Sequence, residues 1–497
     1  MMYTATFDMG TTAAKGVLVS DDRKIVFKHS VPLDTYFEGD FKEQDPRQWY
    51  NAFITIAHEM FSRGFSSKDI RGIIMSGQMQ DLIPLDAEGF PVRNAILYSD
   101  GRADREAKEI SELIGDEAIL RITGNRMDAS IPAAKLLWYR KHELENYQKT
   151  EIYLGCSKDY ITAQLCDTYA CDVTAASTFG LMNIREKRWE ASLLSALDIS
   201  ERTLPKIFYC HEKAGEVTLK GAKETGFLPG TPVYAGTGDA GASTLASGVS
   251  QPGEYSIYLG TSGWIASVSD DVLQRDAGGV FNLAGVPMDT YINVVPFLNA
   301  GGVHKWISGI LHPEESSLPK YDYVDQLLSK STAGSNGLLF LPYLSGERFP
   351  VMDSDTKGCY IGVVNETSKM DLARAPLEGV AYSIRQGLEA IGGTPSLVTL
   401  VGGGAKTPVW RQVLADVLDQ KIVVPSGSEY LPALAIASSV LIAQGVEQDY
   451  GSFIRSIVED TQTKTYLPDP QAVLVMEAQY QRFIKIHQSV APLFELP

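Results

Sequence analysis

Residues 3–20 read YTATFDMGTTAAKGVLVS, and this stretch decides the fold. Two runs rich in apolar and β-branched residues, 3–8 and 14–20, flank the turn Gly10-Thr11-Thr12. Such runs on either side of a glycine turn predict a β-hairpin. A second turn at Asp21-Asp22 leads into a third predicted strand over residues 24–28. The chain therefore opens on an antiparallel meander.

Residues 255–268 read YSIYLGTSGWIASV and repeat this pattern in the second half of the chain. Predicted strands 255–259 and 264–268 flank the turn Gly260-Thr261-Ser262-Gly263. Two such hairpins in one chain of 497 residues predict a duplicated fold. Strands alternate with helices up to about residue 245, which is typical of an α/β architecture. We expect two domains packed against each other, residues 1–245 and 246–497.

Other elements follow from local signals. Asp45 and Pro46 are typical of a helix start and predict a helix over residues 46–63. Residues 71–75 predict a short buried strand that runs into a polar loop, 76–81. Residues 341–350, LPYLSGERFP, have the spacing of a turn-rich surface loop. From spacing alone, this last segment has no assignable chemistry.

The first glycine turn has the composition of a phosphate site. A glycine-centred hairpin lets the backbone approach a phosphate closely, and Thr11 and Thr12 add hydroxyl donors. Lys15 adds a cation, and Asp8 at the strand end is placed to hold Mg²⁺ directly or through water. The alternative is an ordinary hairpin turn, since Gly and Thr are common turn residues.

Residues 235–242, AGTGDAGA, connect a predicted strand (232–235) to a helix that ends near Gly248. Asp239 at the helix start is either a simple N-cap or a general base for a sugar hydroxyl. The helix N-terminus favours the ionised carboxylate, so we expect Asp239 to be charged at neutral pH.

Residues 400–408, LVGGGAKTP, carry three consecutive glycines between an apolar strand and a helix capped by Thr407 and Pro408. Such a loop lets a nucleotide lie against the backbone at a helix N-terminus. It matches neither a P-loop nor the spaced dinucleotide fingerprint. The alternative is a tight strand–helix turn.

Two further groups, residues 76–81 and 98–102, place amides, carboxylates and aromatic surface at strand ends. Such groups suit a polyhydroxylated ligand, whose hydroxyls both donate and accept hydrogen bonds. The alternative is that these polar loop residues satisfy one another.

Composition narrows the function classes. The net charge of −17 disfavours nucleic acid and anionic membranes as partners, and solubility explains it simply. Five cysteines without a CxxC pair argue against a disulfide framework or a zinc site and for a reducing compartment. Asp8 interrupts the first apolar stretch, and no apolar run approaches 18 residues, so we expect no secretory signal, no membrane span and a cytoplasmic location.

Taken together, these motifs resemble the FGGY carbohydrate kinases, within the wider fold of actin, hexokinase and the heat-shock ATPases. The likeness runs nearly from end to end and is strongest to xylulokinases. The segments that carry it are 77–79, 96–102, 258–263, 342–348 and 402–405 with Trp410-Arg411.

The resemblance implies two actin-like (ribonuclease H-like) ATPase domains of α/β class, with ATP and a sugar in a central cleft. It implies that Asp239 is the catalytic base and that Asp8 belongs to the magnesium site. The implied ATP and phosphate contacts are Thr11, Thr12, Lys15, Gly260, Thr261, Gly403, Gly404 and Ala405. The implied substrate contacts are Gln78, Met79, Gln80, Tyr98, Asp100 and Asp239. A homodimer is a family-level expectation.

Three positions depart from the xylulokinase pattern, all on the sugar side. Xylulokinases usually have His at Gln80, Trp at Tyr98 and Asn at Ala240. These departures bear on which sugar is the substrate and not on the phosphoryl-transfer reaction. We expect phosphoryl transfer from MgATP to a terminal hydroxyl of a keto-pentose, with D-xylulose first. Gluconate, ribulose or a polyol is the alternative within the kinases. An actin-fold ATPase without a sugar, or a sugar-sensing module, is the alternative outside them.

Overall fold

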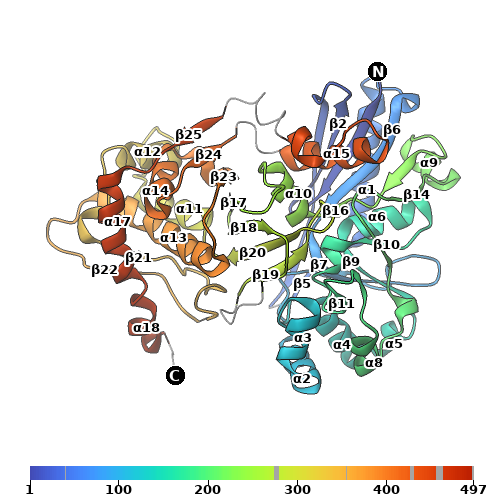
Figure 1. The fold of residues 1–497 in the computed structure, drawn as a ribbon, viewed down its shortest axis with the longest axis horizontal. Coiled ribbons are helices and arrows are strands. Elements are labelled where there is room, and N and C mark those ends of the chain that lie inside the picture. Colours follow the sequence, from blue (N-terminus) through green and yellow to red (C-terminus); the bar gives the residue numbers. More distant parts are fainter. Residues whose placement is uncertain (40, 274–278, 354, 426–429, 455–462, 495–497) are drawn as a thin grey trace.

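The computed structural model describes the chain apart from residues 40, 274–278, 354, 426–429, 455–462 and 495–497. The described residues form two halves, each built on its own mixed sheet with helices around it (Figure 1). The first half holds the chain start, and the second holds the last helices. The predicted α/β class is confirmed.

The first sheet has the strand order β14-β15-β6-β1-β2-β3, with the short β16 paired to β6. The predicted meander is its edge, because β1 pairs antiparallel with β2 and β2 with β3. β1 also pairs parallel with β6. The bounds are β1 Tyr3–Met9, β2 Ala13–Ser20, β3 Ile25–Pro32, β6 Ile70–Gly77, β14 Lys213–Glu216, β15 Pro232–Tyr234 and β16 Thr237–Gly238.

The second sheet has the order β19-β20-β18-β17-β23-β24-β25 and repeats this pairing. β17 pairs antiparallel with β18, and parallel with β23, as β1 does with β2 and β6. The duplicated fold predicted from the two hairpins is therefore confirmed. The bounds are β17 Glu254–Leu259, β18 Gly263–Ser269, β19 Phe281–Ala284, β20 Tyr291–Phe297, β23 Leu397–Val401, β24 Ile422–Val424 and β25 Lys464–Tyr466.

A smaller sheet, β4-β5-β8-β7-β9, lies beside the first. Its bounds are β4 Tyr36–Glu38, β5 Phe41–Gln44, β7 Met79–Leu85, β8 Ala95–Ile96 and β9 Ile152–Cys156. The polar loop predicted for residues 76–81 is wrong, because β6 extends to Gly77 and β7 begins at Met79. The apolar residues that continue β7 to Leu85 give it a buried face, which the four polar residues among 76–81 do not indicate.

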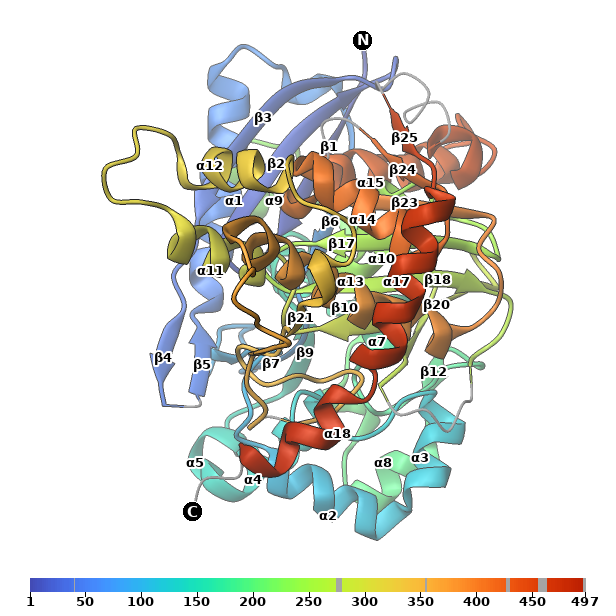
Figure 2. The same cartoon turned by 90° about the vertical axis from the view of Figure 1, so that its left-hand side faces the viewer.

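Helices cover both sheets. Those of the first half are α1 Pro46–Ser62, α2 Asp104–Ile114, α3 Asp116–Thr123, α4 Pro132–His142, α5 Leu144–Tyr147, α6 Ser157–Cys166, α7 Val173–Ala176, α8 Ala191–Leu197, α9 Leu219–Thr225 and α10 Asp239–Ala246. Later helices are α11 Gly301–Leu311, α12 Lys320–Leu328, α13 Lys369–Ile391, α14 Pro408–Leu418, α15 Leu431–Ala443, α17 Pro470–Phe483 and α18 Ile486–Val490. The Asp45 carboxylate accepts from the Arg47 amide and caps α1, as predicted. Figure 2 shows α17 running down the outer surface of the second half, where it packs on α14.

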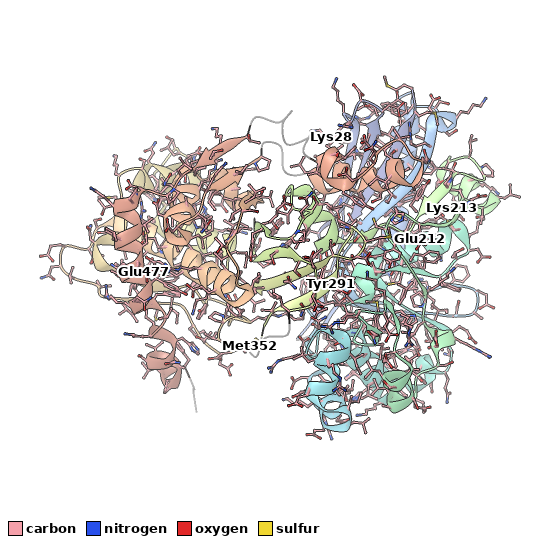
Figure 3. All side chains as sticks on the ribbon, in the orientation of Figure 1. Lys28, Glu212, Lys213, Tyr291, Met352 and Glu477 are labelled. Atoms are coloured by element: carbon pink, nitrogen blue, oxygen red, sulfur yellow. The ribbon has the colours of Figure 1, made fainter. Side chains whose placement is uncertain are left out.

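The late helix α15 returns to the first half. It packs between α10 and the sheet strands β1 and β6, in a cluster that includes Ile74, Leu245 and Val440. The residues of α15 are apolar on all faces of the helix, which fits a helix buried between two layers. Lys28 of β3 lies 5.2 Å from the ring centroid of Tyr430, just before α15 (Figure 3).

The two halves are also joined where β19 meets the loop after α3. Asn282 and Asn125 bond reciprocally: the Asn282 amide donates to Asn125 Oδ1 at 2.7 Å, and Asn125 Nδ2 donates to the Asn282 carbonyl at 2.8 Å. The neighbouring Thr174 hydroxyl donates to the Ala284 carbonyl at 2.7 Å. Tyr291, labelled in Figure 3, lies in the middle of the molecule in this region. Buried polar bonds of this kind fix a defined contact rather than a sliding one.

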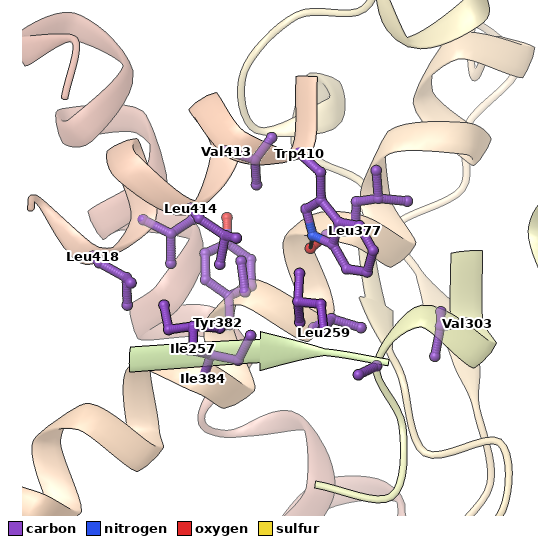
Figure 4. Close-up of a cluster of buried hydrophobic side chains, with 14 of the residues drawn as sticks. Ile257, Leu259, Val303, Leu377, Tyr382, Ile384, Trp410, Val413, Leu414 and Leu418 are labelled. Atoms are coloured by element: carbon purple, nitrogen blue, oxygen red, sulfur yellow. Dashed lines mark hydrogen bonds between the residues drawn. The ribbon is translucent and has the colours of Figure 1, made fainter. Parts of the chain in front are cut away.

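The core of the second half centres on Trp410 of α14 (Figure 4). Its indole N–H donates to the Leu377 carbonyl of α13 at 3.1 Å, and its ring is fully buried. Leu259 at the end of β17 belongs to the same cluster. This packing ties the glycine-rich loop before α14 to the hairpin turn after β17.

Residues 341–350 do not form the surface loop predicted from their turn residues. Tyr343 and Glu347 are 1% and 2% exposed. The Glu347 carboxylate accepts from the amides of Leu298 at 2.6 Å and Asn299 at 3.2 Å. A charged residue can be buried when its oxygens are satisfied, and spacing alone does not reveal such partners. Within the described residues, no helix is both long and apolar enough to span a membrane.

Candidate functional site

The end of β1 places Asp8 between two neighbouring strands. Asp8 lies opposite Lys15 of β2 and opposite Ser76 of β6. The Ser76 hydroxyl donates to Asp8 Oδ1 at 2.9 Å. Burial raises the pKa of Asp8, an effect that the positive charge of Lys15 and the Ser76 bond reduce.

Asp239 comes to the same edge of the sheet by way of β16. Thr237 pairs with Ser76 on β6, and α10 starts two residues later. Asp239 is the first residue of α10, and the cap position is Gly238, so the N-cap alternative for Asp239 is wrong. Asp239 therefore does not serve as the N-cap residue of α10.

The protonation of Asp239 also departs from expectation. Burial raises its pKa to about 7, and the charge of Asp8 adds to this effect. The Ala240 amide at the helix start lowers the pKa of Asp239, as predicted for a helix N-terminus, but its effect is smaller than that of burial. Asp239 is thus balanced between its charged and neutral forms near neutral pH. A pair of close carboxylates of this kind is typical of a functional site.

A hydrogen-bond network supports the first glycine turn from below. The Thr11 hydroxyl donates to Gln78 Oε1 at 2.8 Å, and Gln78 Nε2 donates to Gln44 Oε1 at 2.9 Å. Gln44 in turn donates to the Thr11 carbonyl at 2.7 Å, while Trp49 donates to Gln44. The Thr12 residue is exposed at the tip of the turn. Gln78 therefore holds the turn in place, and its amide is occupied by protein partners.

Of the predicted substrate residues, Met79 and Tyr98 lie near Asp239, and Gln80 follows Met79 on β7. Met79 packs against Gly238, where any side chain would collide with it. Tyr98 is 37% exposed. Burial raises the pKa of Tyr98, and the charge of Asp239 adds to that effect. Arg348 of the second half acts in the opposite direction and so lies near this ring.

Asp100 is fully engaged within the protein. It is 1% exposed, and its oxygens accept from the Lys42 amide at 2.6 Å and from Arg102 Nη2 at 2.7 Å. Burial alone would raise the pKa of Asp100, but these hydrogen bonds hold it below its ordinary value. The Asp100 carboxylate thus has several protein partners, and its role as a sugar contact stays a prediction.

Tyr258 links this acidic group to the second hairpin turn. Its ring stacks on Trp264 across the hairpin, with centroids 4.1 Å apart. Burial raises the pKa of Tyr258, and the charges of Asp239 and Asp8 contribute. Tyr258 stands two residues before Gly260, so the acidic group and the second turn are neighbours. An aromatic pair beside a carboxylate suits a sugar, whose ring or chain offers both apolar and hydroxyl faces.

The second turn and the glycine-rich loop line one cavity of about 560 Å³. Four predicted nucleotide residues lie there: Gly260, Thr261, Gly403 and Gly404. Ala405 is buried behind them, and its carbonyl accepts from Arg411 Nε. The remaining lining residues are Leu259, Gly301, His304, Lys305, Tyr321, Asp322, Asp325, Lys406 and Thr407.

The start of α11 forms one wall of this cavity and was missed by sequence reasoning. The Gly301 amide donates to the Gly260 carbonyl at 2.7 Å, and the Gly302 amide donates to the Thr261 carbonyl at 2.9 Å. A Cβ at Gly301 would collide with the Gly260 carbonyl, so the close approach requires glycine. The sequence does contain a signal for this helix start, the pair Gly301-Gly302 ahead of an amphipathic stretch.

The described residues contain no cluster of three acidic, His or Cys side chains arranged for a metal. Asp8 keeps Oδ2 free of the Ser76 bond and lies close enough to Asp239 to raise its pKa. A carboxylate pair of this kind fits a magnesium ion that uses one or two carboxylates together with substrate phosphates.

Comparison with known proteins gives a consistent result. The N-terminal domain of the FGGY family of carbohydrate kinases matches residues 3–246, and the C-terminal domain of that family matches residues 256–433. A xylulose kinase of Staphylococcus xylosus is 30% identical over 91% of this chain and 92% of its own. A gluconokinase of Bacillus subtilis is 29% identical over 86% of this chain and 85% of its own. The crystal structure of a ligand-bound xylulose kinase from Lactobacillus acidophilus superposes with a TM-score of 0.92 at 26% identity, covering 99% of both chains.

Proposed function

Because the chain belongs to the FGGY family of carbohydrate kinases and is an ATP-dependent sugar kinase, we propose that its acceptor is a keto-pentose. D-xylulose is the first choice, phosphorylated at a terminal hydroxyl to D-xylulose 5-phosphate. The observation that carries this proposal is Asp239, a half-buried carboxylate with a pKa of about 7 beside Tyr98, Met79 and the phosphate turn.

Asp239 acts as the general base. It is the first residue of α10 rather than its N-cap, and a pKa near the working pH is optimal for accepting a hydroxyl proton. The acceptor hydroxyl, once it donates to Asp239, is poised to attack the terminal phosphorus of ATP. Positioning and charge neutralisation supply most of the catalysis in phosphoryl transfer.

The nucleotide lies in the cavity formed by Gly260, Thr261 and the Gly403-Gly404-Ala405 loop. Its phosphates extend toward Thr11, Thr12 and Lys15 on the first hairpin. Mg²⁺ bound with ATP would be held on the protein side by Asp8, and it would neutralise charge on the phosphates. On this division, residues 1–245 carry the acceptor site and residues 246–497 the nucleotide site. Helix α15 is the exception, since it packs in the first half.

D-gluconate is the second candidate. A gluconokinase is among the relatives at similar identity, and Arg348 lies near Tyr98. A guanidinium is well suited to a carboxylate. At Ala240 this chain offers a methyl group where a xylulokinase would offer an amide, so one sugar hydroxyl needs another partner. An unpaired buried hydroxyl costs about 1–3 kcal/mol.

The test is kcat/KM across D-xylulose, D-ribulose, D-gluconate and polyols, with ATP turnover in the absence of acceptor as the baseline. D-xylulose is expected to lead. A value more than about tenfold below another acceptor, a difference of about 1.4 kcal/mol, would reject D-xylulose. In that case the paired change Ala240→Asn with Gln80→His should shift preference back toward it. Gln80 has a φ of 63°, a region that His tolerates better than most residues.

A further inference from the structure

The two backbone segments proposed to contact the acceptor are joined by a buried lysine that the proposed mechanism does not use. We propose that Lys135 is a positioning residue for the acceptor: its ammonium ties together the two backbone segments that carry Met79, Gln80 and Tyr98. This inference rests on the proposed acceptor site, but it does not depend on which sugar is bound.

Lys135 extends from α4 to β7 and is 0% exposed. Its Nζ donates to the Gln80 carbonyl at 2.6 Å and to the Leu97 carbonyl at 2.7 Å. Both acceptors are main-chain atoms of segments that sequence reasoning placed at the substrate. An ammonium on a four-carbon stem can reach both segments from the helix and supply a donor to each.

The first of these segments is bent. Gln80 has a φ of 63°, in the left-handed region that non-glycine residues seldom adopt. The pairing of β7 with β9 shifts register between Met79 and Ile83, so the ladder is interrupted here. The Gln80 carbonyl is turned to Lys135. Local backbone strain of this kind persists only when the surroundings hold it, and it is frequent at functional sites.

The second segment is held by hydrogen bonds to both the carbonyl and the amide of the Leu97–Tyr98 peptide unit. The Leu97 carbonyl accepts from Lys135, and the Tyr98 amide of the same unit donates to Asp81 Oδ1 at 3.1 Å. Asp81 is also 0% exposed. Burial lowers the pKa of Lys135 to about 7, and the interaction with Asp81 is the largest effect that raises it. The two buried side chains therefore hold this peptide unit, and with it the backbone from which Tyr98 extends, in one orientation.

A purely structural role is the competing explanation, since a buried lysine with two partners also stabilises the fold. The two roles differ in what their loss changes. Loss of a positioning residue weakens acceptor binding while nucleotide binding is kept, because the nucleotide cavity lies in the other half. Loss of a residue that only stabilises the fold lowers the affinities for acceptor and nucleotide together, or changes neither.

The experiment measures equilibrium binding by calorimetry, with the acceptor that the wild-type enzyme phosphorylates best, and separately with a non-hydrolysable ATP analogue. Lys135→Met keeps the side-chain length and removes the donors. Its acceptor Kd should rise about 10- to 100-fold, the worth of hydrogen bonds to a charged group. Its nucleotide Kd should stay within about twofold of wild type, well under the ~1.4 kcal/mol of a tenfold change.

Arg374→Met is the matched control, because Arg374 is also a buried cation, paired with Glu378 at 2.5 Å on α13. That variant should lose stability without a specific loss of acceptor affinity.

The double variant Lys135→Met with Asp81→Asn removes both charges and leaves no unpaired buried carboxylate. It decides the matter if Lys135→Met alone does not fold. Unchanged acceptor affinity in either folded variant overturns the proposal, as does an equal loss for acceptor and nucleotide. Failure of both variants to fold would mark Lys135 as a general stability residue and overturn it too. A wild-type enzyme that binds no acceptor of the panel would instead reject the proposed function.

Discussion

Asp239 illustrates how far a single carboxylate depends on its surroundings. The helix start at Asp239 favours its charged form, whereas burial and the neighbouring Asp8 disfavour it. The opposing effects leave the pKa at about 7. Local sequence gives only the first of these influences, because Asp8 is brought alongside by pairing of distant strands.

The pH dependence of the reaction should report this balance. A general base acts only when ionised, so kcat/KM for the acceptor should fall about tenfold per pH unit below pH 7 and level off above it. Asp239→Asn should lower kcat by ~10²–10⁴ and abolish the pH step, while the ATP-analogue Kd stays unchanged. A variant with near wild-type kcat would remove Asp239 from this role.

Two neighbouring glycines of the nucleotide loop should behave differently, although the sequence treats them alike. A Cβ at Gly403 meets nothing within 4 Å, whereas a Cβ at Gly404 lies 2.8 Å from Leu259 Cβ and 2.9 Å from Trp410 Cζ3. Gly403→Val should therefore raise the KM for ATP with little effect on the KM for sugar. Gly404→Val should lower the melting temperature, because its side chain enters the core. Equal rises of both KM values in a stable Gly403→Val enzyme would argue against a local nucleotide role.

At the scale of elements, the segment after β21 (Leu339–Leu341) anchors the residues that lead into α11. Glu347 lies in this segment and accepts four hydrogen bonds, three of them from the amides of Leu298, Asn299 and Arg348, and the fourth from Asn299 Nδ2. Residues 298 and 299 lead directly into α11, whose start approaches the Gly260 turn. Burial raises the pKa of Glu347, but these bonds reduce that effect.

Glu347→Gln tests this link between a buried loop and the nucleotide cavity. One carboxylate oxygen becomes an NH₂ group that faces a donor, so unfolding free energy should fall by about 1–3 kcal/mol. The ATP-analogue Kd should rise as well, since the start of α11 loses its anchor. Urea denaturation and calorimetry measure the two effects. Glu366→Gln, at an exposed position, is the control and should change stability by less than about 0.5 kcal/mol. A Glu347→Gln enzyme with wild-type stability would contradict this account.

At the scale of the whole molecule, the residues proposed to bind the acceptor and the cavity proposed to bind the nucleotide lie in different halves. The halves are pinned by the reciprocal Asn125–Asn282 bonds, and glycines with positive φ occur at Gly248 and Gly253 in the connection before β17. A fixed contact with a short glycine-containing connection is the arrangement from which two halves can rotate toward each other. Closure would also keep water from competing with the sugar as acceptor.

Small-angle scattering should detect this motion. A compact chain of 497 residues has a radius of gyration of about 23 Å. We expect the value to decrease when acceptor and a non-hydrolysable ATP analogue are both bound, and to change less with the analogue alone. An unchanged radius in the doubly bound enzyme, with binding confirmed by calorimetry, would reject closure.

The duplicated fold could be predicted from local sequence, because the strands and turns of the two glycine hairpins are encoded in a few neighbouring residues each. Glycine turns at strand ends are also a local pattern, and from them the sequence predicted functional roles for Asp8, Asp239 and the Gly402–Gly404 loop, which stay predictions. The start of α1 at Pro46 followed from its cap for the same reason.

The protein partners of the polar side chains, in contrast, could not be predicted from the sequence and depend on the folding of the whole chain. Gln78 and Asp100 have the residue types of sugar ligands, yet Gln44 and Arg102 engage them. Lys135 has the residue type of a surface cation and is buried. A side chain's partners come from segments far away in the chain, and local pattern carries no information about them. For the same reason the pKa of Asp239, set by burial and by Asp8, was decided by packing rather than by sequence.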